Sequence, residues 1–153
     1  MSLSDLDDQG RARMVDVSDK PTTARQASAS GTLLCATEAL ISVREGRTPK
    51  GGVIATAKLA GVMGAKRTAE QIPLCHPLPL TKITVTIAED ATLPGFQAVA
   101  EVRTHGPTGV EMEALTAIST AYLTLFDMLN AVDRAKIIGD IRVTAKSGGR
   151  SGG

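Results

Sequence analysis

The sequence has 153 residues with a formal net charge of +1, and 42% of the residues are hydrophobic. This length and apolar content suit one domain with a real core. The near-neutral charge argues against the broad basic field on which nonspecific nucleic-acid binding depends. Two Phe, one Tyr and no Trp are too few aromatic residues for a base-stacking platform, so we expect no nucleic-acid partner.

The two cysteines and the charged N-terminus indicate a reducing compartment. No apolar run typical of a signal peptide occurs near the N-terminus, so we expect a cytoplasmic protein without a disulfide. The longest apolar stretch, from about Ala114 to Phe126, is shorter than the ~20 residues that span a bilayer. This stretch therefore predicts a buried helix and no membrane contact.

The two ends of the chain differ in composition from its middle. Residues 1–25 are rich in charged residues, Ser and Thr and have no sustained period, which predicts a flexible or extended N-terminal arm that includes the run MVDVSDKP. We expect a single domain over residues 26–147 and a disordered Gly/Ser tail over 148–153.

The first half of the domain is expected to contain a strand and two helices. Loose alternation over 24–35 predicts a strand, and Thr37 is a plausible N-cap for a helix that ends near Gly46. A second helix is expected over 50–70. Its small residues permit close contact, either with the following helix or with a second chain. That face consists of Val53, Ala57, Ala60, Gly61 and Gly64.

The second half alternates with the period of half-buried strands over 82–89 and 96–103, which predicts an antiparallel hairpin. A long helix is expected over 108–132 and a last strand over 137–145. The order strand, helices, strand, strand, helix, strand predicts the α+β class. Specifically, we expect a ferredoxin-like sandwich, an antiparallel sheet with helices packed on one face.

Acidic residues stand at both ends of the predicted long helix. Glu111 and Glu113 begin it, and Asp127 lies fourteen residues after Glu113, about 20 Å away along a helix axis. If these acids serve one ligand, the pocket must be assembled from two subunits. Alternatively, Glu111 and Glu113 only favour the helix N-terminus through its dipole. Asp127 is harder to explain structurally, because burial and the dipole both disfavour an acid there.

The proline-rich run IPLCHPLPL forbids regular helix and predicts a rigid loop. It holds Cys75 and His76. A rigid loop would hold His76 in the fixed position that proton transfer or ligand positioning requires. The same histidine could equally cap a carbonyl. Two Cys and two His without a C-x-x-C pair argue against a zinc site, so we expect no metal and no cofactor.

Three lysines are candidates for phosphate contacts, although each lysine taken singly is more often a solvated surface charge. These are Lys50, Lys66 and Lys146. Neither a P-loop motif nor a G-x-G-x-x-G motif occurs in the sequence, so side chains must hold any phosphate groups.

Four runs, in this order and spacing, resemble the cyclic pyranopterin monophosphate synthase family (molybdenum cofactor biosynthesis protein C). They are KGGVIATAKLAGVMGAKRT, IPLCHPLPLTK, TGVEMEALTAIS and AKSGG, and the similarity covers roughly residues 14–149. The resemblance implies a phosphorus–oxygen lyase of molybdopterin biosynthesis. Its substrate would be 3′,8-cyclo-7,8-dihydro-GTP, and its products cyclic pyranopterin monophosphate and pyrophosphate. It also implies ferredoxin-like subunits in a homohexamer, a trimer of dimers with pockets at the dimer interface.

The resemblance also assigns residue roles. It implies a catalytic group of Asp127, Lys50 and His76. The substrate-binding residues that it implies are Leu74, Cys75, His76, Glu111, Met112, Glu113, Lys66 and Lys146. In the resulting hypothesis, lysines draw charge from the triphosphate while a sugar hydroxyl displaces pyrophosphate, and Asp127 and His76 handle protons.

The sequence departs from the family at one position near Asp127. Where the family usually has Lys three residues after the aspartate, this chain has Asn130. Asp127 and Asn130 share a helix face, and Asn carries no charge. One hypothesis is that the chain is the synthase. The alternative is a weakened or noncatalytic relative that binds a pterin phosphate or a partner protein.

Overall fold

Eight helices and strands make up the part of the chain that the computed structural model describes, residues 9–149. In chain order they are β1 (Thr23–Leu34), α1 (Thr37–Arg44), α2 (Val53–Lys66), α3 (Thr68–Gln71), β2 (Leu80–Asp90), β3 (Gly95–Gly106), α4 (Glu111–Met128) and β4 (Ile137–Gly148). Residues 1–8 of the expected arm and 150–153 of the expected tail lie outside the described residues.

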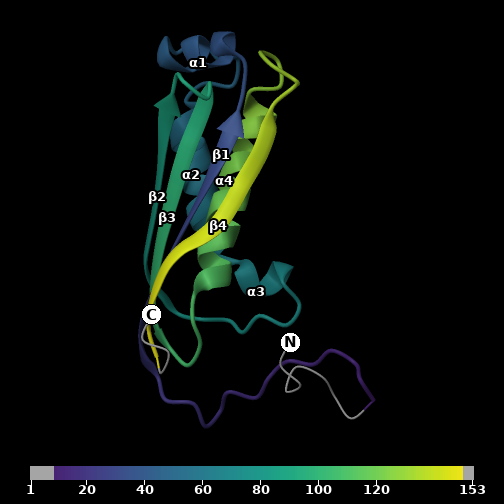
Figure 1. Cartoon of the computed structure of the whole chain (residues 1–153), viewed down its shortest axis with the longest axis vertical. Coiled ribbons are helices and arrows are strands. Elements are labelled where there is room, and N and C mark those ends of the chain that lie inside the picture. Colours follow the sequence, from purple (N-terminus) through teal and green to yellow (C-terminus); the bar gives the residue numbers. More distant parts are fainter. Residues whose placement is uncertain (1–8, 150–153) are drawn as a thin grey trace.

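The four strands form one sheet in the order β2-β3-β1-β4, and every neighbouring pair is antiparallel. Helices α2 and α4 lie along one face of this sheet, whereas α1 and α3 lie near its two ends (Figure 1). This order and the strand–helix–strand–strand–helix–strand connection are those of the ferredoxin-like fold. The expected α+β class is therefore confirmed.

The core lies between the sheet and helices α2 and α4. Alternate residues of β1 and β3 are buried, as the period of two requires for a sheet with one covered face. Tyr122 of α4 is completely buried, and its hydroxyl lies 2.8 Å from the carbonyl oxygen of Gly31 and 3.2 Å from that of Phe96. These contacts attach α4 to β1 and β3.

Helices α2 and α4 approach closely because α2 presents small residues to α4. A Cβ atom added at Gly61 would lie 2.9 Å from the carbonyl oxygen of Ala117 and 3.2 Å from the Cβ of Ala121. A Cβ at Gly64 would overlap the side chain of Thr120. The small-residue face thus contacts the following helix, the first of the two expected alternatives.

The single helix expected over 50–70 is wrong at both ends. Gly51 has a φ of 80°, and the Thr48 hydroxyl donates to the Gly51 carbonyl at 2.6 Å, so the chain turns before α2 begins. At the other end, the Thr68 hydroxyl donates to the Ala65 carbonyl at 2.9 Å. Because this bond competes with the backbone ladder, α2 ends at Lys66 and α3 follows as a separate turn.

Two other helix boundaries also differ from expectation. The N-cap of α1 is Ala36, not Thr37, and no side chain caps it. Asp133 instead accepts the Ala36 N–H at 2.6 Å, which ties the start of α1 to the loop after α4. Helix α4 is shorter than the expected 108–132. Among the described residues, no helix is both long and apolar enough to cross a membrane.

The close α2–α4 contact makes Gly61→Ala a test of the packing. Alanine improves helix propensity by about 1 kcal/mol, but forcing a methyl group into a filled interface costs about 1–3 kcal/mol. We expect a net loss of roughly 1 kcal/mol in the free energy of unfolding, measured in urea. Gly52→Ala is the control, because no heavy atom lies within 4 Å of its added Cβ. Equal stabilities of the two variants would contradict the close contact.

Candidate active site

The candidate residues gather at the two ends of α4. At its first turn lie the buried Glu113, the loop after α3 and the last residues of β4. We call this group the Glu113 end; its members are Lys66, Leu74, Cys75, His76, Glu111, Met112, Glu113 and Lys146. At its last turn lies the Asp127 end, which we define as Lys50, Phe126, Asp127, Asn130 and Lys136.

Glu113 is a buried carboxylic acid. Its exposed fraction is 3%, and burial is the main cause that raises its pKa. The Cys75 thiol donates to Oε2 at a sulfur–oxygen distance of 3.8 Å. Oε1 has no hydrogen-bond partner among residues 9–149. A buried oxygen without a partner is costly, which marks this carboxyl as a candidate ligand contact.

Cys75 is a hydrogen-bond donor at this site. Burial, and then the neighbouring Glu113 carboxylate, raise the pKa of its thiol. The thiolate, which is the nucleophilic form of cysteine, is therefore disfavoured. Cys75 is suited to orient Glu113 and to line the site.

The loop after α3 places His76 against the N-terminal segment. His76 Nε2 lies 2.6 Å from the carbonyl oxygen of Val15, and because a carbonyl only accepts, Nε2 carries the proton. A cavity of about 560 Å³ opens between this segment, the loop and the start of α4. Its lining includes Leu74, Cys75, His76 and Met112, together with Arg13, Val15, Val17 and Lys20.

The N-terminal residues of this lining were missing from the candidates drawn from the sequence. Their only signal was the run MVDVSDKP, which has no periodicity to place it in space. The contact between Val15 and His76 brings segments that are 61 residues apart together, which no local pattern reveals.

Two lysines lie near the Glu113 end. Lys146 Nζ is 3.6 Å from Glu111 Oε1, and both side chains are partly exposed. Lys66, the last residue of α2, lines a small hollow of about 120 Å³ together with Glu113. Both ammonium groups are therefore within the same region as the buried carboxyl.

Asp127 lies at the opposite end of α4 and pairs with Lys50. Lys50 Nζ donates to Asp127 Oδ2 at 3.3 Å, and the side chains are 55% and 71% exposed. The expectation that burial disfavours this acid is wrong, because the last turn of α4 presents Asp127 to solvent. Such exposed pairs contribute at most about 1 kcal/mol to stability, so the pair remains available to a ligand.

Asn130, the position of the departure from the family, has a cation beside it. Lys136 Nζ donates to Asn130 Oδ1 at 2.9 Å and lies 4.2 Å from the centre of the Phe126 ring. Lys136 is buried, with 6% of the residue exposed. Nothing in the sequence singled out Lys136, because it precedes β4 without any motif of its own.

The chain alone does not bring the two ends of α4 together. Helix α4 runs without interruption over Glu111–Met128, so Glu113 and Asp127 are about 20 Å apart along its axis. Lys50 and His76, which the resemblance places in one catalytic group, lie at opposite ends. Within residues 9–149, no group of three or more His, Cys, Asp or Glu residues is placed to hold a metal ion.

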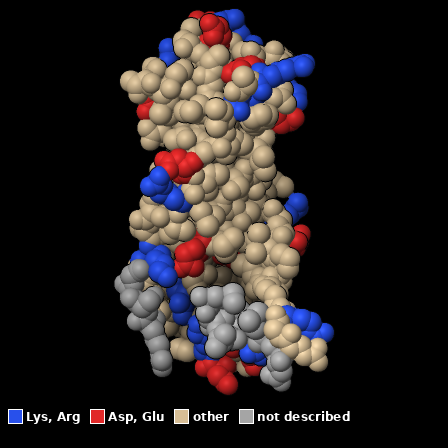
Figure 2. Space-filling view, turned by 45° about the vertical axis from the view of Figure 1, so that its right-hand side comes forward, with Lys and Arg blue, Asp and Glu red and all other residues tan. Residues whose placement is uncertain are grey.

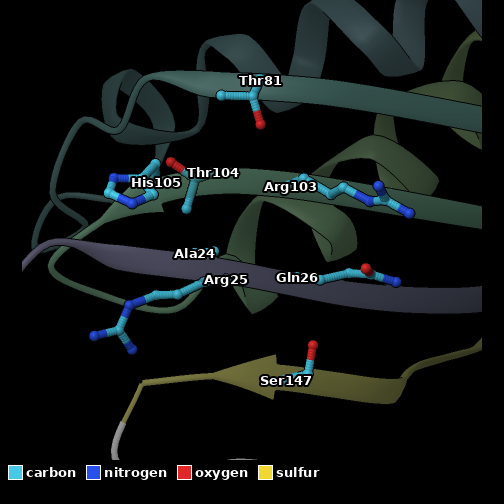
Figure 3. A pocket seen from close by; sticks show the side chains of 8 residues that line it. All are labelled: Ala24, Arg25, Gln26, Thr81, Arg103, Thr104, His105 and Ser147. Atoms are coloured by element: carbon cyan, nitrogen blue, oxygen red, sulfur yellow. The ribbon is translucent and has the colours of Figure 1, made fainter.

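A separate hollow of about 410 Å³ lies where β1, β2, β3 and β4 meet at one end of the sheet (Figure 3). Its cations already have partners. Arg25 turns away from the other side chains and donates to the carbonyl oxygens of Gly106 and Pro107 at 2.9 and 3.1 Å. Arg103 pairs with Glu101 at 3.0 Å. This hollow contains none of the candidate residues.

On the face shown in Figure 2, charged side chains of both signs are spread out. In the view of Figure 2, Lys and Arg residues alternate with Asp and Glu and are separated by wide uncharged areas. The face in view therefore has no single broad basic surface.

The fold and these two clusters define an α+β protein whose acids and lysines are arranged along one central helix. The MoaC family model matches residues 14–149, and the chain belongs to the MoaC family. Among its relatives, the cyclic pyranopterin monophosphate synthase of Methylobacterium sp. strain 4-46 is 58% identical over 99% of this chain and 94% of the relative. The synthase of Dinoroseobacter shibae is 55% identical, over 98% and 95%. The synthase of Nostoc sp. strain PCC 7120 is 54% identical, over 99% and 90%.

The raised pKa of Glu113 gives a prediction about stability and pH. An acid whose pKa is higher in the folded than in the unfolded state binds more protons when folded, so stability falls as pH rises through the interval between the two pKa values. Glu113→Gln removes this titration. We expect the variant to have a higher Tm than the wild type at pH 7 and a smaller advantage as pH falls toward 4.5.

The measurement is Tm against pH by circular dichroism, with Glu111→Gln as the control. That change removes only the partly exposed contact with Lys146, which is worth less than about 1 kcal/mol. A Glu113→Gln variant with the same Tm as the wild type at every pH would show that the carboxyl is not held in an unfavourable setting.

Proposed function

We propose that the chain is a cyclic pyranopterin monophosphate synthase, a phosphorus–oxygen lyase of molybdenum cofactor biosynthesis. Its substrate would be the small molecule 3′,8-cyclo-7,8-dihydro-GTP, and its products cyclic pyranopterin monophosphate and pyrophosphate. Identity of 54–58% over nearly the whole chain to relatives of that name carries the proposal. The proposed setting is the cytoplasm, where thiols such as Cys35 and Cys75 stay reduced.

In the proposed reaction, the triphosphate is held by side chains. Lys50, Lys66 and Lys146 neutralise its charge, a sugar hydroxyl attacks the innermost phosphorus, and the bond to the leaving pyrophosphate breaks. Asp127, exposed and paired with Lys50, is accessible to accept a proton. His76 Nε2–H is fixed by Val15 at the other end of α4.

This proposal requires a homo-oligomer with the site at a dimer interface, and we propose a hexamer built as a trimer of dimers. The supporting observation is the length of α4. Because Glu113 and Asp127 are about 20 Å apart along one rigid helix, a single ligand reaches both ends only where two copies of the chain meet.

Turnover by the purified protein is the direct test. Production of pyrophosphate from the cyclised dihydro-GTP is expected for the wild type. Lys50→Ala and Asp127→Asn should each lower kcat by about 10²–10⁴, the usual contribution of a general acid or a charge-stabilising group. Lys58→Ala provides the control, since Lys58 is an exposed lysine of α2 outside both clusters.

A wild-type protein that binds the substrate without turning it over would favour the alternative of a noncatalytic relative. Equal losses in Lys58→Ala and Lys50→Ala would indicate that the lysine effect is nonspecific. Neither Lys50 nor Asp127 is needed for folding, because both are exposed, so the variants should keep the Tm of the wild type.

Mixing Glu113→Gln, which removes a proposed substrate contact and should therefore abolish turnover, with Asp127→Asn tests the shared site. Glu113→Gln and Asp127→Asn subunits are co-expressed with different tags, so that mixed dimers form. In a mixed dimer one site has both substitutions and the other has neither. Random pairing therefore leaves about a quarter of the sites intact, and the mixture should regain about that share of wild-type activity.

The same two variants mixed without subunit exchange provide the baseline for this experiment. A mixture that stays as inactive as its separate components, despite confirmed mixed dimers, would show that each site is built from one chain.

A further inference from the structure

Lys136 is a buried cation that the proposed reaction does not use. The residue as a whole is 6% exposed, whereas the side chain of Lys50, at the same end of α4, is 55% exposed. Burial lowers the pKa of this lysine, and the nearby Asp133 and Cys35 act in the opposite direction. Burying an ammonium is costly unless hydrogen bonds replace its water, so its partners require an explanation.

The contacts of Lys136 all suit a protonated amine. Its Nζ donates to Asn130 Oδ1 at 2.9 Å and to the backbone carbonyl of Asp133, and it lies over the face of the Phe126 ring. Two acceptors and an aromatic face match an ammonium, which has three donors and no acceptor. The ammonium also lies beyond the last turn of α4, where the helix dipole favours positive charge.

This arrangement fixes the orientation of the Asn130 side chain. Because an ammonium cannot accept a hydrogen bond, the amide oxygen must face Lys136, and the amide nitrogen with its two N–H groups must face away. Asn130 itself is exposed, and within residues 9–149 no acceptor contacts its Nδ2. The nearby positive charge polarises the amide and strengthens these two donors.

These donors belong to a residue that lies one turn after the exposed Asp127. Asn130 follows Asp127 by one turn, and its backbone N–H bonds the Asp127 carbonyl at 3.3 Å. Lys50 contacts Asp127 from α2. The exposed surface at this end of α4 therefore presents a carboxylate, an ammonium and an oriented amide, which together can bind oxygen atoms of an anionic ligand.

We propose that Lys136 is a positioning residue of the proposed active site, whose ammonium orients the Asn130 amide so that its Nδ2–H groups bind an oxygen of the substrate beside Asp127. This inference rests on the proposed function. It differs from a purely structural role, in which Lys136 only stabilises the end of α4 and the Asn130 contact has no consequence for turnover.

Asn130→Asp and Asn130→Ala together test the Asn130 donors, because the carboxylate of the first variant also adds a charge that repels an anionic substrate, whereas alanine removes the donors without adding a charge. The carboxylate keeps an acceptor for Lys136 at an exposed position, so the fold and the Tm should be retained, but both N–H donors are lost. We expect kcat/KM for the cyclised dihydro-GTP to fall at least about tenfold, the effect of losing one charge-assisted hydrogen bond. Asn130→Ala should lower kcat/KM by a similar factor and should also lower the Tm, because it removes one acceptor of the buried Lys136 ammonium.

Lys136→Met completes a double-mutant cycle with Asn130→Ala. Methionine keeps an unbranched stem beside Phe126 and removes the charge. If Lys136 acts through Asn130, the double variant should lose no more kcat/KM than Asn130→Ala alone, whereas independent effects multiply. Arg134→Met is the matched control, because Arg134 is an exposed cation of the same loop and should leave kcat/KM unchanged.

The outcomes are distinguishable. Wild-type kcat/KM in Asn130→Asp would overturn the positioning role and leave the proposed function intact. A double variant whose loss of kcat/KM equals the product of the two single losses would do the same. A wild type without turnover overturns the proposed function and the inference with it. Should Lys136→Met not fold, Asn130→Asp and Asn130→Ala decide the question, since both substitutions lie at an exposed position.

Discussion

The close contact between α2 and α4 is the constraint on which the rest of the structure depends. Gly61 and Gly64 of α2 present no side chain to α4, so the two helices can lie close together on one face of the sheet. Because the helices run in opposite directions, Lys50 just before α2 reaches the end of α4, and Lys66 at the last turn of α2 reaches its beginning. The helix pair thus places Lys50 near Asp127 at the end of α4 and Lys66 near Glu113 at its beginning.

The two ends of α4 are different electrostatic environments. Glu113 is buried, with one carboxyl oxygen unpaired among the described residues, and burial raises its pKa. Asp127 is in solvent and contacts an exposed lysine. Two carboxyl groups in such different environments can take different chemical roles in one site. Their separation along a rigid helix is also the reason that the proposed site needs a second chain.

Cations near Asp127 also differ in how firmly they are held. The Lys50 ammonium is on an exposed side chain and is screened by water, so it can move from Asp127 to a phosphate at little cost. Lys136 is held by a ring face and two oxygens and has little freedom to move. A mobile charge suits the neutralisation of a substrate, and a fixed charge suits the orientation of a neighbouring side chain.

The sequence by itself determined the element order, the α+β class and the residue types at both ends of α4. Those features follow from local periodicity: strands alternate with a period of two, and small residues recur on one face of α2. Helix ends were less well predicted, because the bond from Thr68 to Ala65 and the contact of Asp133 with Ala36 override local preference. Only the tertiary structure decided that Val15 meets His76, that Asp127 is exposed and that Lys136 is buried beside Asn130. The contact between Val15 and His76 joins segments far apart in the chain. The exposure of Asp127 and the burial of Lys136 depend on how α4 packs and on how the chain turns after it. No local sequence pattern encodes these features.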